Sequence, residues 1–174
     1  MKLKALKDFN AWIGYSGFEI RYSRSKQLLD HVMNSKMQLA QAVDATKICC
    51  STQIEIAVMR TYRAFKMGRN IAKNMSMELL LRLSGKRQIH EALNLLGLKE
   101  SSKYVALICA DSDQGSLEDF IRKTLSEFAI REDETLIEVY DKSKEEVLKL
   151  TYDLKTQDII KEVLMKIAYL EILS

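Results

Sequence analysis

The order of strand-like and helix-like segments along this chain is compatible with only a few classes of fold. The first 22 residues read as one or two short strands, broken at Gly14 and Gly17. A block of helical patterns follows, then the apolar run Lys103–Ala110, whose Tyr, Val and Ile content is typical of a buried strand. Further helical patterns complete the chain, without strict strand–helix alternation. We therefore expect an α+β fold, a small mixed or antiparallel sheet covered by helices.

Most of the expected helices have a start or stop signal in the sequence. Helices are expected near residues 25–39, 52–67, 74–83, 87–96, 115–128 and 156–173. The signals are capping boxes at Thr52/Glu55 and Ser143/Glu146, an Asn74 or Ser76 cap, and closing glycines at Gly68, Gly85 and Gly97. Residues 40–48 are expected to form a strand, and residues 135–140 an edge strand.

Size and composition indicate one cytoplasmic domain over residues 1–174. The chain has no Pro and only six Gly, so no segment resembles a flexible linker. No apolar run approaches the roughly 20 residues needed to span a bilayer, so we expect no membrane association. The three cysteines, Cys49, Cys50 and Cys109, lack the spacing of a disulfide framework or a zinc site. We expect no metal and no cofactor.

Sequence motifs for catalysis are missing. There is no G-x-G-x-x-G, no Walker A loop and no G-x-S-x-G elbow, and Gly85-Lys86-Arg87 lacks the other residues of a phosphate loop. We therefore expect no catalytic residue and no small-molecule substrate. A small enzyme with an unrecognised pocket remains an alternative.

Charge is distributed unevenly along the chain. Residues 1–103 hold 18 Lys+Arg and 8 Asp+Glu, whereas residues 104–174 hold 9 and 16. The cations concentrate between Met59 and Gly97, a pattern that suits an anionic partner such as nucleic acid or an acidic protein. Two solvated faces of opposite sign would give the same counts. The basic side chains of this segment are Arg60, Arg63, Lys66, Arg69, Lys73, Arg82, Lys86 and Arg87.

Several side chains of this segment have the chemistry to bind single-stranded RNA. Arg60, Arg63 and Lys66 form a helical stripe that could follow phosphates. The backbone amides of the Ser84-Gly85 turn, flanked by Arg82, Lys86 and Arg87, could hold a phosphate. Asn70, Asn74 and Gln88 could read base edges, while Met77 or Ile89 could pack on a base. Alternatively, Arg87 and Gln88 cap and connect two helices.

The last helix carries more apolar residues than one core can cover. At about 100° per residue, an apolar arc is formed by Ile159, Ile160, Val163, Leu164, Ile167, Ala168 and Leu170. Tyr169, Ile172 and Leu173 fall outside that arc, which suggests a surface for a protein partner. A homodimer would satisfy the same pattern.

A motif in the basic segment resembles the signature of a known family. The pattern M-E-[IL]-L-x-x-[SA]-x-x-R-Q-I-x-x-A is matched by Met77, Glu78, Leu80, Ser84, Arg87, Gln88, Ile89 and Ala92, with Gly97 closing the second helix. This resembles the small kinase-binding subunit of the KEOPS (EKC) complex, the PRPK-binding protein family. The resemblance covers about residues 45–110 and 156–172.

The resemblance implies a non-catalytic, kinase-binding subunit. KEOPS installs the threonylcarbamoyl group on an adenosine of certain tRNAs, and the small subunit docks on its atypical kinase/ATPase and grips the 3′ CCA end of tRNA. The expected tRNA-binding residues are Arg60, Arg63, Lys66, Arg69, Asn70, Asn74, Met77, Arg82, Ser84, Gly85, Lys86, Arg87, Gln88 and Ile89. The expected kinase-binding residues are Ile160, Val163, Leu164, Ile167, Tyr169, Leu170, Ile172 and Leu173. A protein-only interaction module without RNA binding is the alternative.

Overall fold

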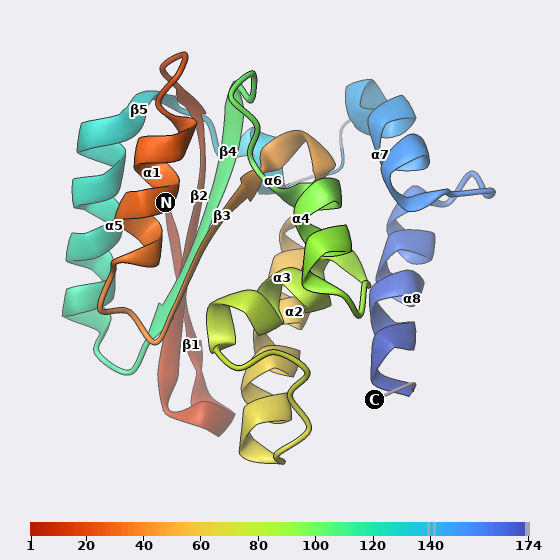
Figure 1. Ribbon diagram of the computed structural model, residues 1–174, viewed down its shortest axis with the longest axis horizontal. Helices are drawn as coiled ribbons and strands as arrows, with labels where there is room; N and C mark the ends of the chain where they lie inside the picture. The colour runs from red at the N-terminus through yellow and green to blue at the C-terminus, as the bar shows by residue number, and fades with distance from the viewer. Residues whose placement is uncertain (139, 141, 173–174) are drawn as a thin grey trace. The chain divides into compact units, whose positions relative to one another are not determined.

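The computed structural model describes residues 1–138, 140 and 142–172, and the chain divides into two compact units (Figure 1). Unit 1 comprises residues 1–45 and 98–136. Unit 2 comprises residues 46–97 and the described part of 137–174. The expectation of one domain over residues 1–174 stays a prediction.

Unit 1 contains an antiparallel sheet. Its strands are β1 (Lys2–Leu6), β2 (Ala11–Ile20), β3 (Leu39–Asp44), β4 (Tyr104–Asp111) and β5 (Ala129–Glu132). The order is β1-β2-β4-β3, and β5 pairs with the end of β2. A short 3₁₀ helix, η1 (Lys7–Phe9), joins β1 to β2. The predicted α+β class is confirmed, and the sheet is antiparallel rather than mixed.

Two helices, α1 (Ser25–Met33) and α5 (Gln114–Phe128), cover one face of this sheet (Figure 1). Asp113 caps α5 by accepting a hydrogen bond from the Ser116 N–H at 2.7 Å. Helix α5 packs closely over Gly14 in β2: a Cβ there would lie 2.4 Å from Cδ1 of Ile121, so that side chain would have to move. The core between sheet and helices includes Phe18, Ile20, Leu28, Val32, Leu107, Leu117, Ile121 and Phe128.

Unit 2 is helical. Its longer helices are α2 (Ser51–Lys66), α3 (Met75–Ser84), α4 (Ile89–Leu96), α7 (Glu145–Tyr152) and α8 (Ile159–Ile172). Of the short elements, η3 (Lys142–Lys144) belongs to unit 2, whereas η2 (Ala45–Lys47) and α6 (Thr135–Glu138) each include residues of both units. In the described part of the chain, no helix is long and apolar enough to cross a membrane.

Four local predictions are wrong. Residues 135–138 are helical rather than an edge strand, and the strand lies earlier, at Ala129–Glu132; residue 139 of the predicted strand lies outside the described residues. Neither capping box forms, because the N-cap positions are occupied by Cys50 and Lys144 and no side chain caps them. Helix α1 ends at Met33, six residues before the start of β3, so the predicted helix over 25–39 was too long.

Candidate functional site

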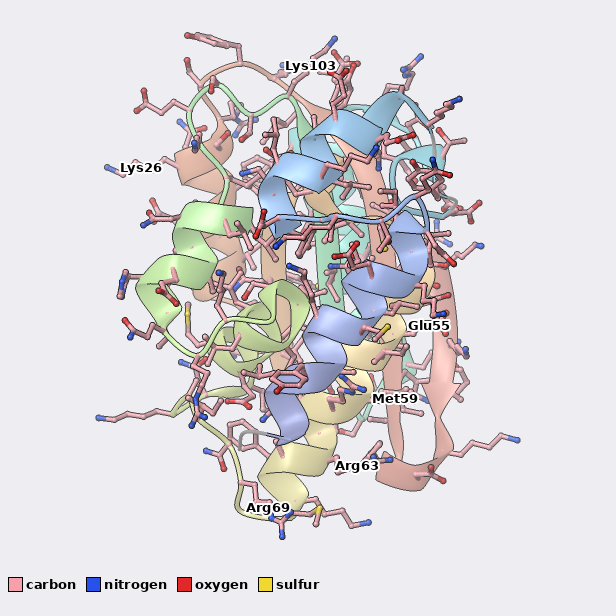
Figure 2. The ribbon with its side chains drawn as sticks, turned by 90° about the vertical axis from the view of Figure 1, so that its right-hand side faces the viewer. Lys26, Glu55, Met59, Arg63, Arg69 and Lys103 are labelled. Carbon is pink, nitrogen blue, oxygen red and sulfur yellow. The ribbon has the colours of Figure 1, made fainter. Side chains whose placement is uncertain are left out.

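Helix α2 presents part of the predicted cationic stripe to solvent. Arg63 and Lys66 are exposed, and Figure 2 shows Glu55, Met59 and Arg63 following one side of the helix toward Arg69. Arg60 is instead half-buried, and its Nη1 donates a hydrogen bond to the carbonyl oxygen of Ile167 in α8 at 2.8 Å. Arg60 therefore connects α2 to the last helix through this bond, and its place in a phosphate-tracking stripe stays a prediction.

The loop between α2 and α3 uses its two asparagines internally. Asn74, one of the two predicted caps, accepts a hydrogen bond from the Met77 N–H at 2.9 Å and caps α3. The half-buried Asn70 donates from Nδ2 to the carbonyl of Ala72 at 3.0 Å. A base-reading role for either amide stays a prediction. Arg69 is exposed in the same loop.

A buried ion pair lies beneath this loop. Glu78 and Arg82 have 0% and 1% of their side chains exposed, and Arg82 donates from Nε and Nη2 to Oε1 of Glu78 at 2.8 and 2.6 Å. Oε2 of Glu78 accepts from the backbone N–H groups of Ile71 and Ala72 at 2.8 and 2.7 Å. The carboxylate thus joins the loop to α3. Arg82 has no route to a phosphate from this position, so its predicted contact with RNA is wrong.

The turn between α3 and α4 satisfies its own backbone. The Gly85 N–H donates to the carbonyl of Leu81 at 2.9 Å, and the Lys86 N–H donates to Oγ of the buried Ser84 at 3.2 Å. These amides are therefore occupied, so the expectation that the Ser84-Gly85 turn offers them to a phosphate is wrong. Gly85 also lies against α8, since a Cβ there would be 3.1 Å from the carbonyl oxygen of Lys166.

Six exposed cations remain on three successive segments of unit 2, and we call them the basic surface. They comprise Arg63, Lys66, Arg69, Lys73, Lys86 and Arg87. The exposed Gln88 and Ile89 and the half-buried Met77 accompany them. Because buried Glu78 and Arg82 compensate each other, the excess positive charge of residues 46–97 faces water.

The last helix divides its residues between the core of unit 2 and solvent. Val163, Ile167 and Leu170 are buried, so the prediction that they contact a partner is wrong. Ile160 and Leu164 are half-buried, and Tyr169 is 59% exposed. The side chain of Ile172 and the whole of Leu173 lie outside what the structure describes.

Sequence reasoning missed three exposed apolar residues near this helix. Met165 is 60% exposed, and its position four residues before Tyr169 places both on one side of α8. Leu150 and Val147, spaced i, i+3 on α7, are 86% and 38% exposed. Helix α7 packs against α8 within unit 2. We group the exposed and half-buried apolar residues of α7 and α8 by their exposure and call them the apolar surface: Val147, Leu150, Leu164, Met165 and Tyr169. Only the i, i+3 and i, i+4 spacings could have indicated the members that the sequence reasoning missed.

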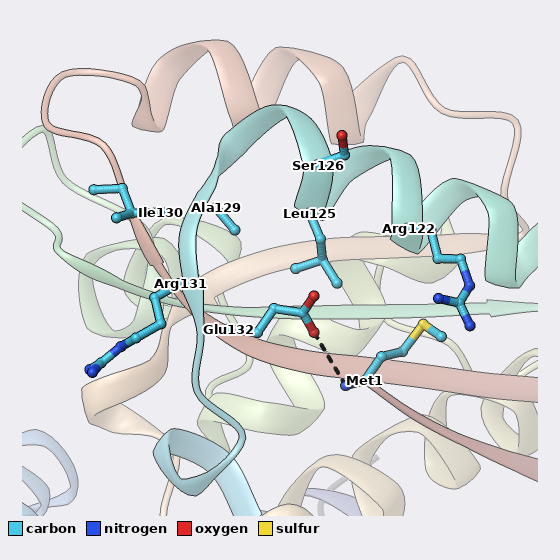
Figure 3. Close-up of a pocket in the computed structure, with 8 residues that line it drawn as sticks. All are labelled: Met1, Arg122, Leu125, Ser126, Ala129, Ile130, Arg131 and Glu132. Atoms are coloured by element: carbon cyan, nitrogen blue, oxygen red, sulfur yellow. Dashed lines mark ion pairs between the residues drawn. The ribbon is translucent and has the colours of Figure 1, made fainter.

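The cavity described in unit 1 is lined in part by charged groups that are already paired. One cavity in unit 1, of about 330 Å³, is lined by residues that include Met1, Arg122 and Glu132 (Figure 3). The ammonium group of Met1 lies 3.6 Å from Glu132 and also pairs with Glu134, while Arg122 pairs with Glu118 at 2.6 Å. No cysteine or histidine lines this cavity. Among the described residues, no group of three or more His, Cys, Asp or Glu could hold a metal ion.

Comparisons with known proteins agree with the motif resemblance. The model of the family described as kinase binding protein CGI-121 matches residues 22–172. The chain is 32% identical to the regulatory protein Cgi121 of Methanocaldococcus jannaschii over 116 residues, which are 66% of this chain and 74% of that protein. It is 33% identical to the KEOPS complex subunit Cgi121 of Pyrococcus abyssi over 72 residues, 41% of this chain and 42% of that protein. Strands β1 and β2 precede the family match.

Proposed function

Because the chain belongs to the kinase binding protein CGI-121 family, we propose that it is a non-catalytic regulatory subunit of a cytoplasmic KEOPS complex. In this proposal the apolar surface of α7 and α8 binds the atypical kinase/ATPase of the complex. The basic surface recruits tRNA through its single-stranded 3′ CCA end for threonylcarbamoylation.

The kinase-binding half is supported by the family match together with the apolar surface. Tyr169, Met165 and Leu150 leave most of their area in water, and full burial of an exposed apolar side chain of this size is worth about 1.5–3 kcal/mol. Aromatic and long aliphatic side chains of this kind dominate the binding energy of many interfaces. Their neighbours Val163 and Ile167 anchor α8 in the core, which presents the surface on a fixed helix.

Co-purification with the kinase tests this half. The change is Leu150→Glu together with Tyr169→Glu, which places charge on the apolar surface without touching the core. We expect affinity for the kinase to fall more than about tenfold, since each 1.4 kcal/mol corresponds to a factor of ten. Met33→Glu is the matched control, because Met33 is 69% exposed in unit 1. Unchanged affinity in the double variant would refute the assignment of this surface.

The RNA-binding half is supported by the basic surface. Residues 46–97 hold nine Lys+Arg against three Asp+Glu, and six of the cations are exposed. Cations that contact phosphates release counterions, so such binding weakens steeply as salt rises. The exposed Gln88 and Ile89 add a hydrogen-bonding group and an apolar group of the kind that single-stranded RNA binding uses.

Salt-dependent tRNA binding tests this half. We expect Arg63→Glu with Arg69→Glu to weaken binding and to reduce the salt slope by about one for each lost phosphate contact, so about two for this variant. Lys26→Glu with Lys123→Glu is the control, because both lysines are exposed helical residues of unit 1. Intact tRNA should bind, and tRNA trimmed of its 3′ CCA should not. Equal binding of trimmed tRNA would refute recognition of that end.

A protein-only module is a second candidate, favoured by the contacts between the basic segment and α8. Arg60 donates to Ile167, and Gly85 lies against Lys166, so the basic segment adjoins the helix that carries part of the apolar surface. In this case Arg87→Glu would weaken kinase association and leave tRNA binding unchanged. Weakened tRNA binding with intact kinase association favours the RNA-recruiting subunit instead.

A further inference from the structure

Two adjacent cysteines form a thiol pair at the start of α2. Cys49 is fully buried and Cys50 is 6% exposed. Their sulfur atoms lie 3.5 Å apart, within hydrogen-bonding distance for sulfur. Neither thiol has a role in kinase or tRNA binding as proposed above, and the contact between the two sulfurs distinguishes this pair from Cys109.

The surroundings of the pair shift the pKa values of the two thiols in opposite directions. Hydrogen bonding from the Cys49 thiol, together with the backbone N–H groups of Gln53 and Thr52 in the first turn of α2, lowers the pKa of Cys50 to about 6, against the effect of burial. The pKa of Cys49 is raised by the same contact with Cys50 and by burial. The opposite directions of the two shifts favour Cys50 as the thiolate and Cys49 as the S–H donor of the pair.

The pair also belongs to a buried polar junction in unit 2. The Cys49 N–H donates to Oε1 of Gln53 at 2.9 Å, and Nε2 of Gln53 donates to the hydroxyl of Tyr152 in α7 at 2.7 Å. That hydroxyl donates to the carbonyl of Lys47 at 3.0 Å, and the Lys144 ammonium donates to the carbonyl of Ile48 at 3.3 Å. Lys144 and Tyr152 are the titratable groups that these contacts bring to the junction, and burial raises the pKa of Tyr152.

We propose that Cys49 and Cys50 form a reversible two-electron redox site that reacts with hydroperoxides. The Cys50 thiolate attacks one peroxide oxygen and breaks the O–O bond, which forms a sulfenic acid and releases hydroxide or an alkoxide. The Cys49 thiol then attacks the Cys50 sulfur. Its proton leaves with the sulfenic hydroxyl group as water, and the S–S bond forms. Two electrons pass from the sulfurs to the peroxide, and a small thiol reverses the step by exchange.

The adjacency of the two residues makes the oxidised form easy to reduce. Cα atoms joined by a trans peptide are about 3.8 Å apart, shorter than the roughly 4.4–6.8 Å of most disulfides. A bridge in this ring is strained, and strained disulfides are the labile or regulatory ones. Closure of the ring must also move the backbone at residues 49–50. That backbone positions Gln53 through the hydrogen bond from the Cys49 N–H to Oε1 of Gln53. We therefore expect oxidation to loosen the junction between α2 and α7 and to lower the melting temperature.

Cys109 provides an internal control for the test. It is fully buried in β4 of unit 1, and burial raises its pKa. One sample of native protein is treated with iodoacetamide across a pH series. A second sample is treated with hydrogen peroxide and then with dithiothreitol. Peptide masses report the state of each cysteine in both samples. We expect alkylation of Cys50 to exceed that of Cys109 and to titrate near pH 6. Peroxide should remove two hydrogen atoms from the peptide with both cysteines, and dithiothreitol should restore them.

Two results would overturn the proposal. One is alkylation of Cys50 no faster than that of Cys109 in native protein at neutral pH. The other is a Cys50 that gains oxygen atoms in the wild type and forms no bridge with Cys49. Cys49→Ser should convert the bridge into stable oxygen adducts of Cys50, whereas Cys109→Ser should leave the reaction unchanged. Because the two decisive measurements use the wild-type protein, a folding defect in Cys49→Ser does not change their meaning.

Discussion

The buried side chain of Glu78 orders a loop that carries part of the basic surface. Its carboxylate accepts four hydrogen bonds, two from Arg82 and two from the loop that leads into α3. Burying a charge is costly unless it is paired and hydrogen-bonded. With both oxygens occupied, Glu78 fixes the loop of residues 67–74, which joins α2 to α3, against α3. The exposed cations Arg69 and Lys73 are therefore carried on an ordered loop.

Removal of the Arg82 guanidinium should separate this structural role from RNA binding. Arg82→Met leaves the Glu78 carboxylate buried without its cation, and breaking a buried pair in this way costs about 3–5 kcal/mol. We expect the urea midpoint of unfolding to fall accordingly. Arg63→Met, on an exposed position of α2, should change stability by no more than about 0.5 kcal/mol. Equal stability of the two variants would contradict the buried pair.

The sequence could not separate Arg82 from its exposed neighbours. Glu78 and Arg82 are spaced i, i+4, which is also the spacing of an ordinary surface pair on a helix. Only the packing of α3 against α2 and α8 decides that this pair is buried. Ser84 was misassigned for the same reason, because its use inside the turn depends on the path of the backbone after α3. Asn74 was predicted correctly, because N-capping is a local interaction.

Among the elements, prediction succeeded where the signal was strong and local. The buried strand β4 and the closing Gly85 were read from composition and turn chemistry. The segment 129–140 failed, because its four-residue strand β5 is defined by pairing with β2 rather than by its own pattern. Helix α8 was predicted as an element, but which of its apolar residues face the core depends on the packing partners.

Two glycines with left-handed backbone should respond differently to substitution. Gly68 and Gly85 have φ of +65° and +68°, but a Cβ meets nothing within 4 Å at Gly68 and lies 3.1 Å from the carbonyl oxygen of Lys166 at Gly85. Gly68→Ala should cost about 1–2 kcal/mol, for the left-handed conformation alone. Gly85→Ala should cost more, because α3 and α8 must also move apart. Thermal unfolding measures both; equal losses would mean that α8 does not press on this turn.

At the scale of the whole molecule, the charge asymmetry predicted from the sequence remains visible in the structure. The excess of cations belongs to residues 46–97 of unit 2, where six are exposed. The division of the chain into two units that each combine distant segments was not visible in the sequence, because no linker or shift in composition marks it. Contacts between residues far apart in the chain define such units, and local patterns do not report them.

Acid should destabilise both units through carboxylates that stabilise helices. Asp113 caps α5 in unit 1, and hydrogen bonds from Ser116 lower its pKa. In unit 2, the Thr156 and Lys155 N–H groups lower the pKa of Glu162. A carboxyl group with a lowered pKa binds fewer protons in the folded state than in the unfolded state. Its stabilisation is therefore present above the ordinary carboxyl pKa and is lost as pH falls through the folded value.

We accordingly expect the urea midpoint of unfolding to fall as pH drops from about 5 toward 2. Far-ultraviolet circular dichroism measures the unfolding at each pH. Asp113→Asn with Glu162→Gln should lower stability at pH 7 and make the acid dependence shallower, because two of the groups that bind protons on unfolding are gone. Asp119→Asn, at an exposed position of α5, is the matched control and should reproduce the wild-type profile. A double variant with the full wild-type acid dependence would show that these two carboxylates contribute nothing to acid unfolding. The dependence would then have to come from other carboxylates, such as Glu145, whose pKa is lowered by its contact with Lys149.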